Sequence, residues 1–107
     1  DDSGGPLTLQ ALKDNTIQLA NIYSADPNIG TSGLVTLTDP KNLFLASNVV
    51  PLINKSAASP QVSEVINAVS AALTTADLVQ LNGFSVNDQK SSSQIAKDWL
   101  AKVKLFS

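Results

Sequence analysis

The stretch NIYSADPNI, residues 21–29, says most about the fold and function of this chain. Apolar and polar side chains alternate in the residues that lead into it, which predicts a short strand from Ile17 to the only tyrosine, Tyr23. Asp26 and Pro27 then indicate a turn, because proline forces the residue before it into an extended conformation. A lone tyrosine at the mouth of a strand, followed by a rigid turn, predicts the wall of a ligand site.

Two more strands are predicted after this turn. Residues 34–37 form one of them, and a turn over residues 39–42 closes it. Residues 48–54 form the other, and Pro51 places it at an edge or an irregularity of a sheet, because proline cannot donate a ladder hydrogen bond. The pattern of residues 43–46, between these two segments, is ambiguous and does not distinguish a strand from other structure.

The C-terminal part of the chain predicts three helices. Ser59 is a cap for the first, and apolar residues recur after it at helical spacing. A threonine at 74 or 75 caps the second, which we expect to end at Gly83. Serines at 91–93 open the third, and Trp99 falls on its apolar stripe, where core packing is the favoured role.

The N-terminus predicts a turn followed by one further helix. Pro6 suits a first helical position, and the apolar pattern stops near Asp14. The glycines at 4 and 5 could offer free backbone N–H groups to an anion at the start of this helix. They lack the spacing of a nucleotide-binding loop, so a simple turn is the favoured interpretation.

Composition excludes several classes of function. The chain has 107 residues, 43% of them hydrophobic and 15% charged, which fits one folded domain. Its formal net charge is -2 and its seven basic residues are scattered lysines, so no basic stripe predicts a nucleic acid partner. There is no histidine or cysteine, which argues against zinc sites, thiolate nucleophiles and Ser-His triads, and we expect neither a metal nor a cofactor nor enzymatic activity.

The order of the elements predicts an α/β fold, with short strands first and three helices last. Three short strands from separate neighbourhoods make a poor sheet by themselves. Methionine is absent, so we expect the chain to be processed, excised or truncated. The chain is therefore interpreted as the C-terminal part of a larger α/β protein.

Tyr23 and Asp26 are the candidate ligand-binding residues, and each has a plainer interpretation. The Tyr23 ring could lie against a cation, which is worth about 0.5–2 kcal/mol, or could simply close a strand. The Asp26 carboxylate could contact a ligand ammonium, but capping the turn before Pro27 is favoured.

Several segments, in this order and spacing, resemble one known family. They are SGGPLT at 3–8, IYSADPNI at 22–29, GLV at 33–35, LTDPK at 37–41, NVVPL at 48–52, LTTADL at 73–78 and IAKDWL at 95–100. Together they are similar to the C-terminal half of the osmoprotectant-binding proteins of ABC importers, which hold glycine betaine, choline, carnitine or proline betaine. No single segment is specific, but their order covers essentially the whole chain.

The resemblance implies the C-terminal portion of a type II periplasmic-binding-protein fold, as an incomplete two-lobed protein. Residues 1–22 would end one lobe, 23–28 would form a hinge crossing, and 29–107 would complete the other lobe. The crossing segment is one place where the family puts an aromatic of its ligand cage, so Tyr23 takes that role by resemblance, and Asn48 lies where relatives carry an aromatic or polar residue near the pocket.

The implied function is solute capture for an ABC permease, by hinge closure and without a chemical step. The implied location is outside the cytoplasm, with or without a lipid anchor. One tyrosine is not a cage, and the chain has no arginine for a carboxylate, so a missing N-terminal half would complete the site. Alone, the chain is expected to fold in part, self-associate or swap elements. A sensing or permease-fused domain of the same fold and a small structural or interaction domain are the alternatives.

Overall fold

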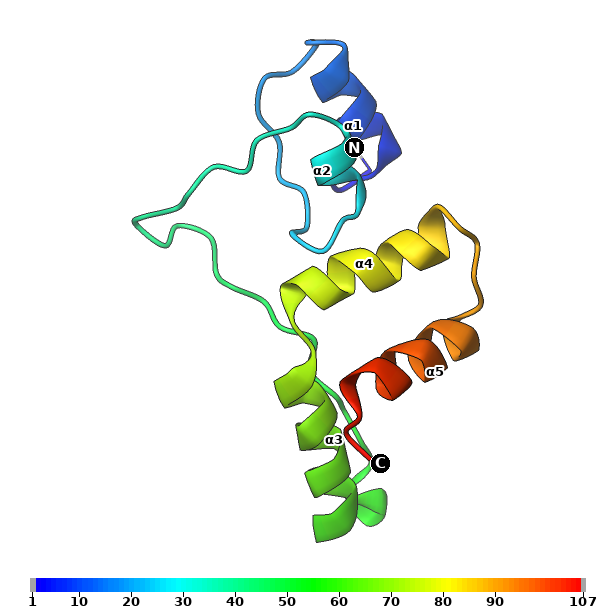
Figure 1. The fold of residues 1–107 in the computed structure, drawn as a ribbon. Helices are drawn as coiled ribbons and strands as arrows, with labels where there is room; N and C mark the ends of the chain where they lie inside the picture. The colour runs from blue at the N-terminus through cyan, green and yellow to red at the C-terminus, as the bar shows by residue number, and fades with distance from the viewer. Residues whose placement is uncertain (1, 107) are drawn as a thin grey trace.

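The computed structural model describes residues 2–106, and every regular element in that range is a helix (Figure 1). The elements are α1 (Pro6–Lys13), α2 (Asn28–Thr31), the 3-10 turn η1 (Lys55–Ala57), α3 (Pro60–Ala72), α4 (Thr75–Val86) and α5 (Ser92–Val103). Helices α1 and α2 lie at one end of the molecule and α3 at the other, with α4 and α5 between them.

The predicted α/β fold is wrong for this chain. The segments 17–23, 34–37 and 48–54 contain no strand, and neither does any other part of residues 2–106. A strand needs a neighbour to receive its ladder hydrogen bonds, and none of these segments lies in register with another. Alternation of side chains alone does not supply a pairing partner.

The predicted helix starts in the C-terminal part are confirmed. The Ser59 hydroxyl accepts a hydrogen bond from the Val62 N–H at 3.2 Å, and the Ser91 hydroxyl accepts one from Gln94 N–H at 3.3 Å. Thr74 and Asp77 form a capping box, in which each side chain accepts a hydrogen bond from the other residue's backbone N–H. Local side-chain chemistry therefore sets where these three helices begin.

The predicted end of the second of these helices, at Gly83, is wrong. Helix α4 continues through Gly83 to Val86. A Cβ built at Gly83 would lie 3.6 Å from the Pro27 Cβ, so the turn at residues 23–28, which we call the crossing segment, approaches α4 closely at this glycine. Gly83 is therefore a packing position inside a helix, where glycine costs roughly 1 kcal/mol relative to alanine.

The small core lies between α4 and α5. Its buried apolar residues are Ile95, 8% exposed, and Trp99, 6% exposed, and both belong to α5. The core role expected for Trp99 is confirmed. We define the helical unit as α3, α4 and α5, residues 60–103.

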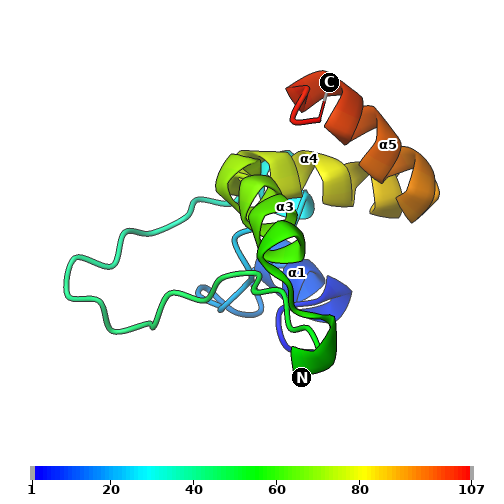
Figure 2. The ribbon, with the colours of Figure 1, turned by 90° about the horizontal axis from the view of Figure 1, so that it is seen from below.

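The segment between α2 and η1, residues 34–54, stands away from the helices, and we call it the arm. Figures 1 and 2 show it as an open excursion that leaves from the α2 end and returns at the start of α3. At its tip the predicted turn over residues 39–42 is confirmed, since the Asn42 N–H donates to the Asp39 carbonyl at 3.2 Å and the Phe44 N–H donates to the Asp39 carboxylate at 2.9 Å.

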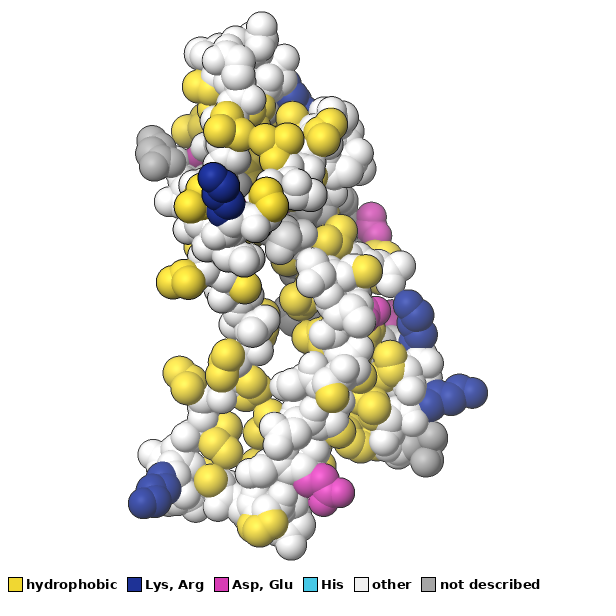
Figure 3. Space-filling view, turned by 90° about the vertical axis from the view of Figure 1, so that its left-hand side faces the viewer, with side chains coloured by type: hydrophobic (Ala, Val, Ile, Leu, Met, Phe, Trp, Pro, Cys, Tyr) yellow, Lys and Arg dark blue, Asp and Glu magenta, His cyan; other side chains and the backbone are white. Residues whose placement is uncertain are grey.

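The molecule is open rather than compact. Its radius of gyration is 17.0 Å, against about 13 Å for a compact domain of this length. Its accessible surface is 8531 Å², against about 5700 Å² for a compact protein of 11.2 kDa. The excess is roughly 2800 Å², and apolar side chains are spread over the face of the molecule that the arm forms (Figure 3).

No single helix within residues 2–106 is long and apolar enough to cross a membrane. Helices α3 and α4 meet the length and composition criteria only as a pair, and they bend by 90° at the break between them. The predicted lobe boundaries, 1–22, 23–28 and 29–107, include residues 1 and 107, which lie outside the described part, and the hinge at 23–28 stays a prediction.

Candidate functional site

The start of α1 is occupied by a carboxylate of the chain itself. Asp2 accepts hydrogen bonds from the N–H groups of Leu7 at 2.7 Å and Thr8 at 3.2 Å, and from the Thr8 hydroxyl at 2.6 Å. The Thr8 hydroxyl bond, with help from these backbone N–H groups, holds the pKa of Asp2 below its usual value. An external anion would compete with Asp2, so these bonds favour the simple turn over an anion site.

Gly4 fixes how this turn meets the residues just before the crossing segment. Its φ is +89°, and a Cβ at this position would lie 2.6 Å from the Asn21 carbonyl oxygen. Only glycine fits both the conformation and the space. The turn before α1 therefore sets the path of the chain just before Tyr23.

Tyr23 and Asp26 lie in one turn within residues 23–28, as the Ser/Asp/Pro pattern predicts. Asp26 N–H donates to the Tyr23 carbonyl at 2.9 Å, and the Asp26 carboxylate accepts hydrogen bonds from the Asn28 backbone at 2.8 Å and its amide side chain at 3.0 Å. The turn-capping role favoured for Asp26 is confirmed by these bonds. The Tyr23 side chain is 76% exposed, so its ring is open to a ligand or to a further part of a protein.

Helix α4 holds the crossing segment in place. The Asn82 side chain donates a hydrogen bond to the Ala25 carbonyl at 3.0 Å, and Pro27 lies over Gly83. These contacts join residues almost sixty positions apart in the sequence. Sequence reasoning missed Asn82 and Gly83, because each is an ordinary residue for a helix and only the tertiary contact reveals its role.

Asn48 is not brought to the crossing segment by any contact of the described chain. It lies in the arm, where it is exposed, as are the residues on either side of it. The structure thus places two of the three predicted ligand-binding residues on one turn and the third on the arm. Whether Asn48 contacts a solute stays a prediction.

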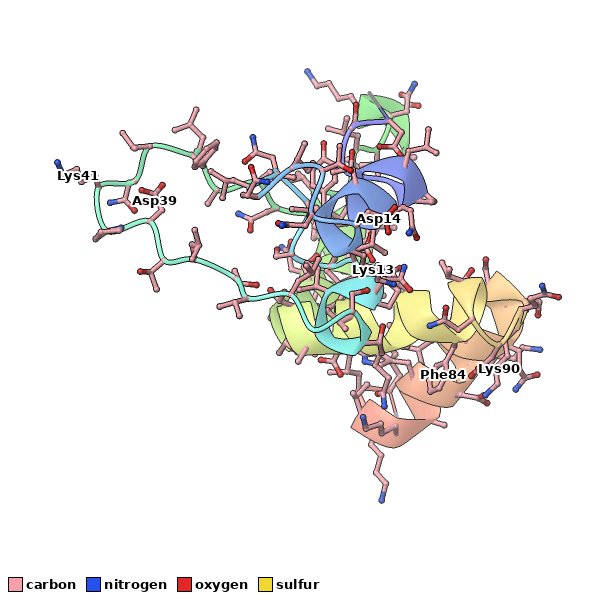
Figure 4. All side chains as sticks on the ribbon, turned by 90° about the horizontal axis from the view of Figure 1, so that it is seen from above. Lys13, Asp14, Asp39, Lys41, Phe84 and Lys90 are labelled. Carbon is pink, nitrogen blue, oxygen red and sulfur yellow. The ribbon has the colours of Figure 1, made fainter. Side chains whose placement is uncertain are left out.

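The aromatic residues do not form a cage within residues 2–106. Trp99 is buried in the helical unit, and its indole Nε1 is buried without a hydrogen-bond partner. Phe84 is covered by a cation of the chain itself, since Lys90 Nζ lies 4.3 Å from its ring centroid (Figure 4). Tyr23, Phe44 and Phe106 are exposed on separate segments. A solute cation would need further aromatic faces beside Tyr23.

A groove of about 370 Å³ lies between α3, α4 and α5. Its walls include Val69 of α3, Leu81 and Ser85 of α4, and Ile95 and Trp99 of α5. No charged side chain lines it, and neither do the three predicted ligand-binding residues. An uncharged groove offers no counter-charge to a betaine carboxylate, so it is a poor site for such a solute.

No cluster of acidic side chains within residues 2–106 has the geometry of a metal site. The capping box holds the pKa of Asp77 below its ordinary value, mainly through the hydrogen bond that the Thr74 hydroxyl donates to it. This carboxylate is a helix cap, and the described residues around it offer no catalytic arrangement.

The comparison with known families identifies the chain's relatives. A family model described as the substrate-binding domain of an ABC-type glycine betaine transport system matches residues 3–102. This confirms the resemblance to osmoprotectant-binding proteins that the sequence segments indicate. No solved structure matches the chain.

Proposed function

We propose that this chain contributes one side of a binding site for a quaternary ammonium solute such as glycine betaine or choline. The chain belongs to the family of substrate-binding domains of ABC-type glycine betaine transport systems. The observation that carries this proposal is the match over residues 3–102, nearly the whole chain. It supports substrate binding in ABC transport. The identity of the solute, the contact residues and the mechanism are the proposed part.

Tyr23 is the proposed contact for the ammonium group. A quaternary ammonium cannot donate a hydrogen bond, so a protein recognises its diffuse charge and apolar shell with aromatic faces. Tyr23 is the exposed aromatic of the crossing segment, and the Asp26 turn, tied to α4 through Asn82, fixes its backbone. Asn48 is the proposed polar contact from the arm.

The site is completed from outside this chain. Within residues 2–106 a single aromatic is exposed on the crossing segment, and no arginine occurs in the sequence to bind a solute carboxylate. We infer that a preceding part of the same protein supplies the remaining cage and the carboxylate donors. Closure about the crossing segment would then trap the solute outside the cytoplasm and present it to an ABC permease, with no chemical step.

Calorimetric titration tests this function. The longer protein that includes this chain would be titrated with glycine betaine, choline, carnitine and proline, as wild type and as Tyr23→Ala. We expect one quaternary ammonium compound to bind and the substitution to weaken it at least tenfold, which corresponds to about 1.4 kcal/mol. Tyr23→Phe is the matched control, because it keeps the aromatic face and should bind within a few-fold of wild type.

Two results would contradict the proposal. Absence of heat with every quaternary ammonium compound would remove the solute class. Binding that Tyr23→Ala leaves unchanged would remove the role of Tyr23 while leaving the solute class in place.

A further inference from the structure

The crossing segment lies against α4 and is not a free loop. Residues 25–29 are half-buried, whereas the Tyr23 side chain is exposed. The side-chain amide of Asn82, on α4, donates a hydrogen bond to the Ala25 carbonyl at 3.0 Å. In Figure 1 the loop that leads into α2 accordingly lies beside α4. The crossing segment is thus attached to α4 and leaves the Tyr23 ring open.

The bond within the turn carries this attachment to Tyr23. The Asp26 N–H donates to the Tyr23 carbonyl at 2.9 Å, which closes a four-residue turn. Ala25, the residue that Asn82 holds, lies inside this closed turn. The position of Ala25 against α4 therefore fixes the point from which the Tyr23 side chain extends.

A steric contact beside Asn82 supports the same arrangement. A Cβ built at Gly83 would lie 3.6 Å from the Pro27 Cβ, which is ordinary van der Waals contact. Because glycine has no side chain, Pro27 comes close to the backbone of α4 at the residue that follows Asn82. The turn is therefore received by shape at Gly83 and by a hydrogen bond at Asn82.

The chemistry of Asn82 suits a neighbour of a cation site. An asparagine amide donates hydrogen bonds without carrying a net charge. A lysine could also donate to the Ala25 carbonyl, but its ammonium would repel a cationic solute at Tyr23. An aspartate would carry the opposite charge but could not donate while ionised.

We propose that Asn82 is a positioning residue for the solute site, which touches no solute itself and holds the turn so that the Tyr23 ring meets the ammonium group. This inference rests on the proposed function, in which Tyr23 contacts the solute. Asn82 is exposed, so water competes for its amide and the bond contributes a modest part of the affinity. The role of α4 in binding is then to fix the turn.

A double-mutant cycle tests this role. The longer protein that includes this chain would be titrated calorimetrically with glycine betaine and with choline. Asn82→Leu keeps nearly the same side-chain shape but cannot donate, and we expect it to weaken binding about three- to tenfold. In the Tyr23→Ala background the same substitution should change affinity by less than about twofold, because the contact that Asn82 positions is already absent.

Asn67→Leu is the matched control for this cycle. Asn67 is an exposed asparagine of α3, and the same change there should leave binding unchanged. Two results would overturn the proposal while leaving the proposed function in place. One is an Asn82→Leu variant that binds like wild type, and the other is an equal loss of affinity with and without Tyr23.

Hydrogen exchange of the solute-free longer protein separates this inference from the proposed function. Asn82→Leu should speed exchange in peptides that cover residues 23–28 at least about threefold, because the turn opens more often, while α5 exchanges as in wild type. Unchanged exchange over residues 23–28 would overturn the positioning role. Faster exchange without binding of any quaternary ammonium compound would remove the proposed function and the solute role of Asn82 with it, while its attachment to the turn would stand.

Discussion

The helical unit and the arm contain similar proportions of apolar residues, yet only the helical unit buries any of them. In the unit, Ser59, Thr74 and Ser91 cap three helices from their own side chains, and α5 places Trp99 against α4. In the arm, Asp39 organises a turn, but the extended segments on either side have no partner. The difference shows that capping side chains fix where helices begin, while both the helices and the extended apolar segments depend on packing against another surface for their stability.

The largest predicted difference between the two regions follows from truncating one apolar side chain in each. Trp99→Ala removes the main core contact and should lower the free energy of unfolding by about 3–5 kcal/mol, enough to abolish most helical signal. Leu45→Ala should change it by less than about 0.5 kcal/mol, because this side chain is 96% exposed. Urea unfolding followed by far-ultraviolet circular dichroism measures both. Equal effects would show that the arm is packed within the monomer.

A smaller effect is predicted for the helix cap at Thr74. Thr74→Ala removes the hydroxyl from the capping box and should cost about 1 kcal/mol of unfolding free energy. Thr74→Ser, which keeps a hydroxyl, should recover most of it. Thr36→Ala, at an exposed arm threonine, is the control in the other region and should be neutral. A neutral Thr74→Ala in the same urea titration would mean that packing alone sets the start of α4.

The contact between the Lys90 ammonium and the Phe84 ring should contribute less to stability than the Thr74 cap. Lys90 Nζ lies 4.3 Å from the Phe84 ring centroid, and an exposed contact of this kind is worth about 0.5–1 kcal/mol. Lys90→Gln should therefore lower the thermal midpoint slightly. Figure 4 shows Lys41 at the tip of the arm, away from the helices, and Lys41→Gln is the matched change of charge that should leave the midpoint unchanged.

The smallest effect is a dependence on pH in the acid range. The Thr74 hydroxyl lowers the pKa of Asp77 from its ordinary value of 3.8, so the folded state favours the ionised carboxylate. Stability from this cap is therefore fully present above the ordinary value and is lost as pH falls through the lowered one. Asp77→Asn should flatten that part of the stability profile between about pH 5 and pH 2. A profile unchanged by the substitution would contradict the assignment.

The sequence predicted the helices better than the rest of the fold, and the reason is physical. The starts of α1, α3, α4 and α5 depend on a proline or a capping side chain within three residues, which is visible in the chain. The strands depended on partners that the sequence pattern does not locate. The end of α4 was misjudged because Gly83 is a contact for Pro27, and no local signal distinguishes that role from a terminating glycine.

The turn that carries the candidate site could be predicted from the sequence, but its attachment to the rest of the fold could not. The turn at Tyr23 and Asp26 was recognisable because proline and aspartate define it locally. The attachment of this turn to α4 by Asn82 was not, since the two are joined only by folding. The side chains that complete a site around Tyr23 have no local signal near it in the sequence, so the sequence pattern does not identify them.

Hydrogen exchange followed by mass spectrometry tests the contrast between the two regions most directly. It would be carried out on the wild-type chain at low protein concentration. We predict slow exchange in α4 and α5, where backbone hydrogen bonds surround the Trp99 core, and exchange at nearly the rate of an unstructured peptide over residues 34–54. Protection of the arm comparable to that of α5 would contradict the account.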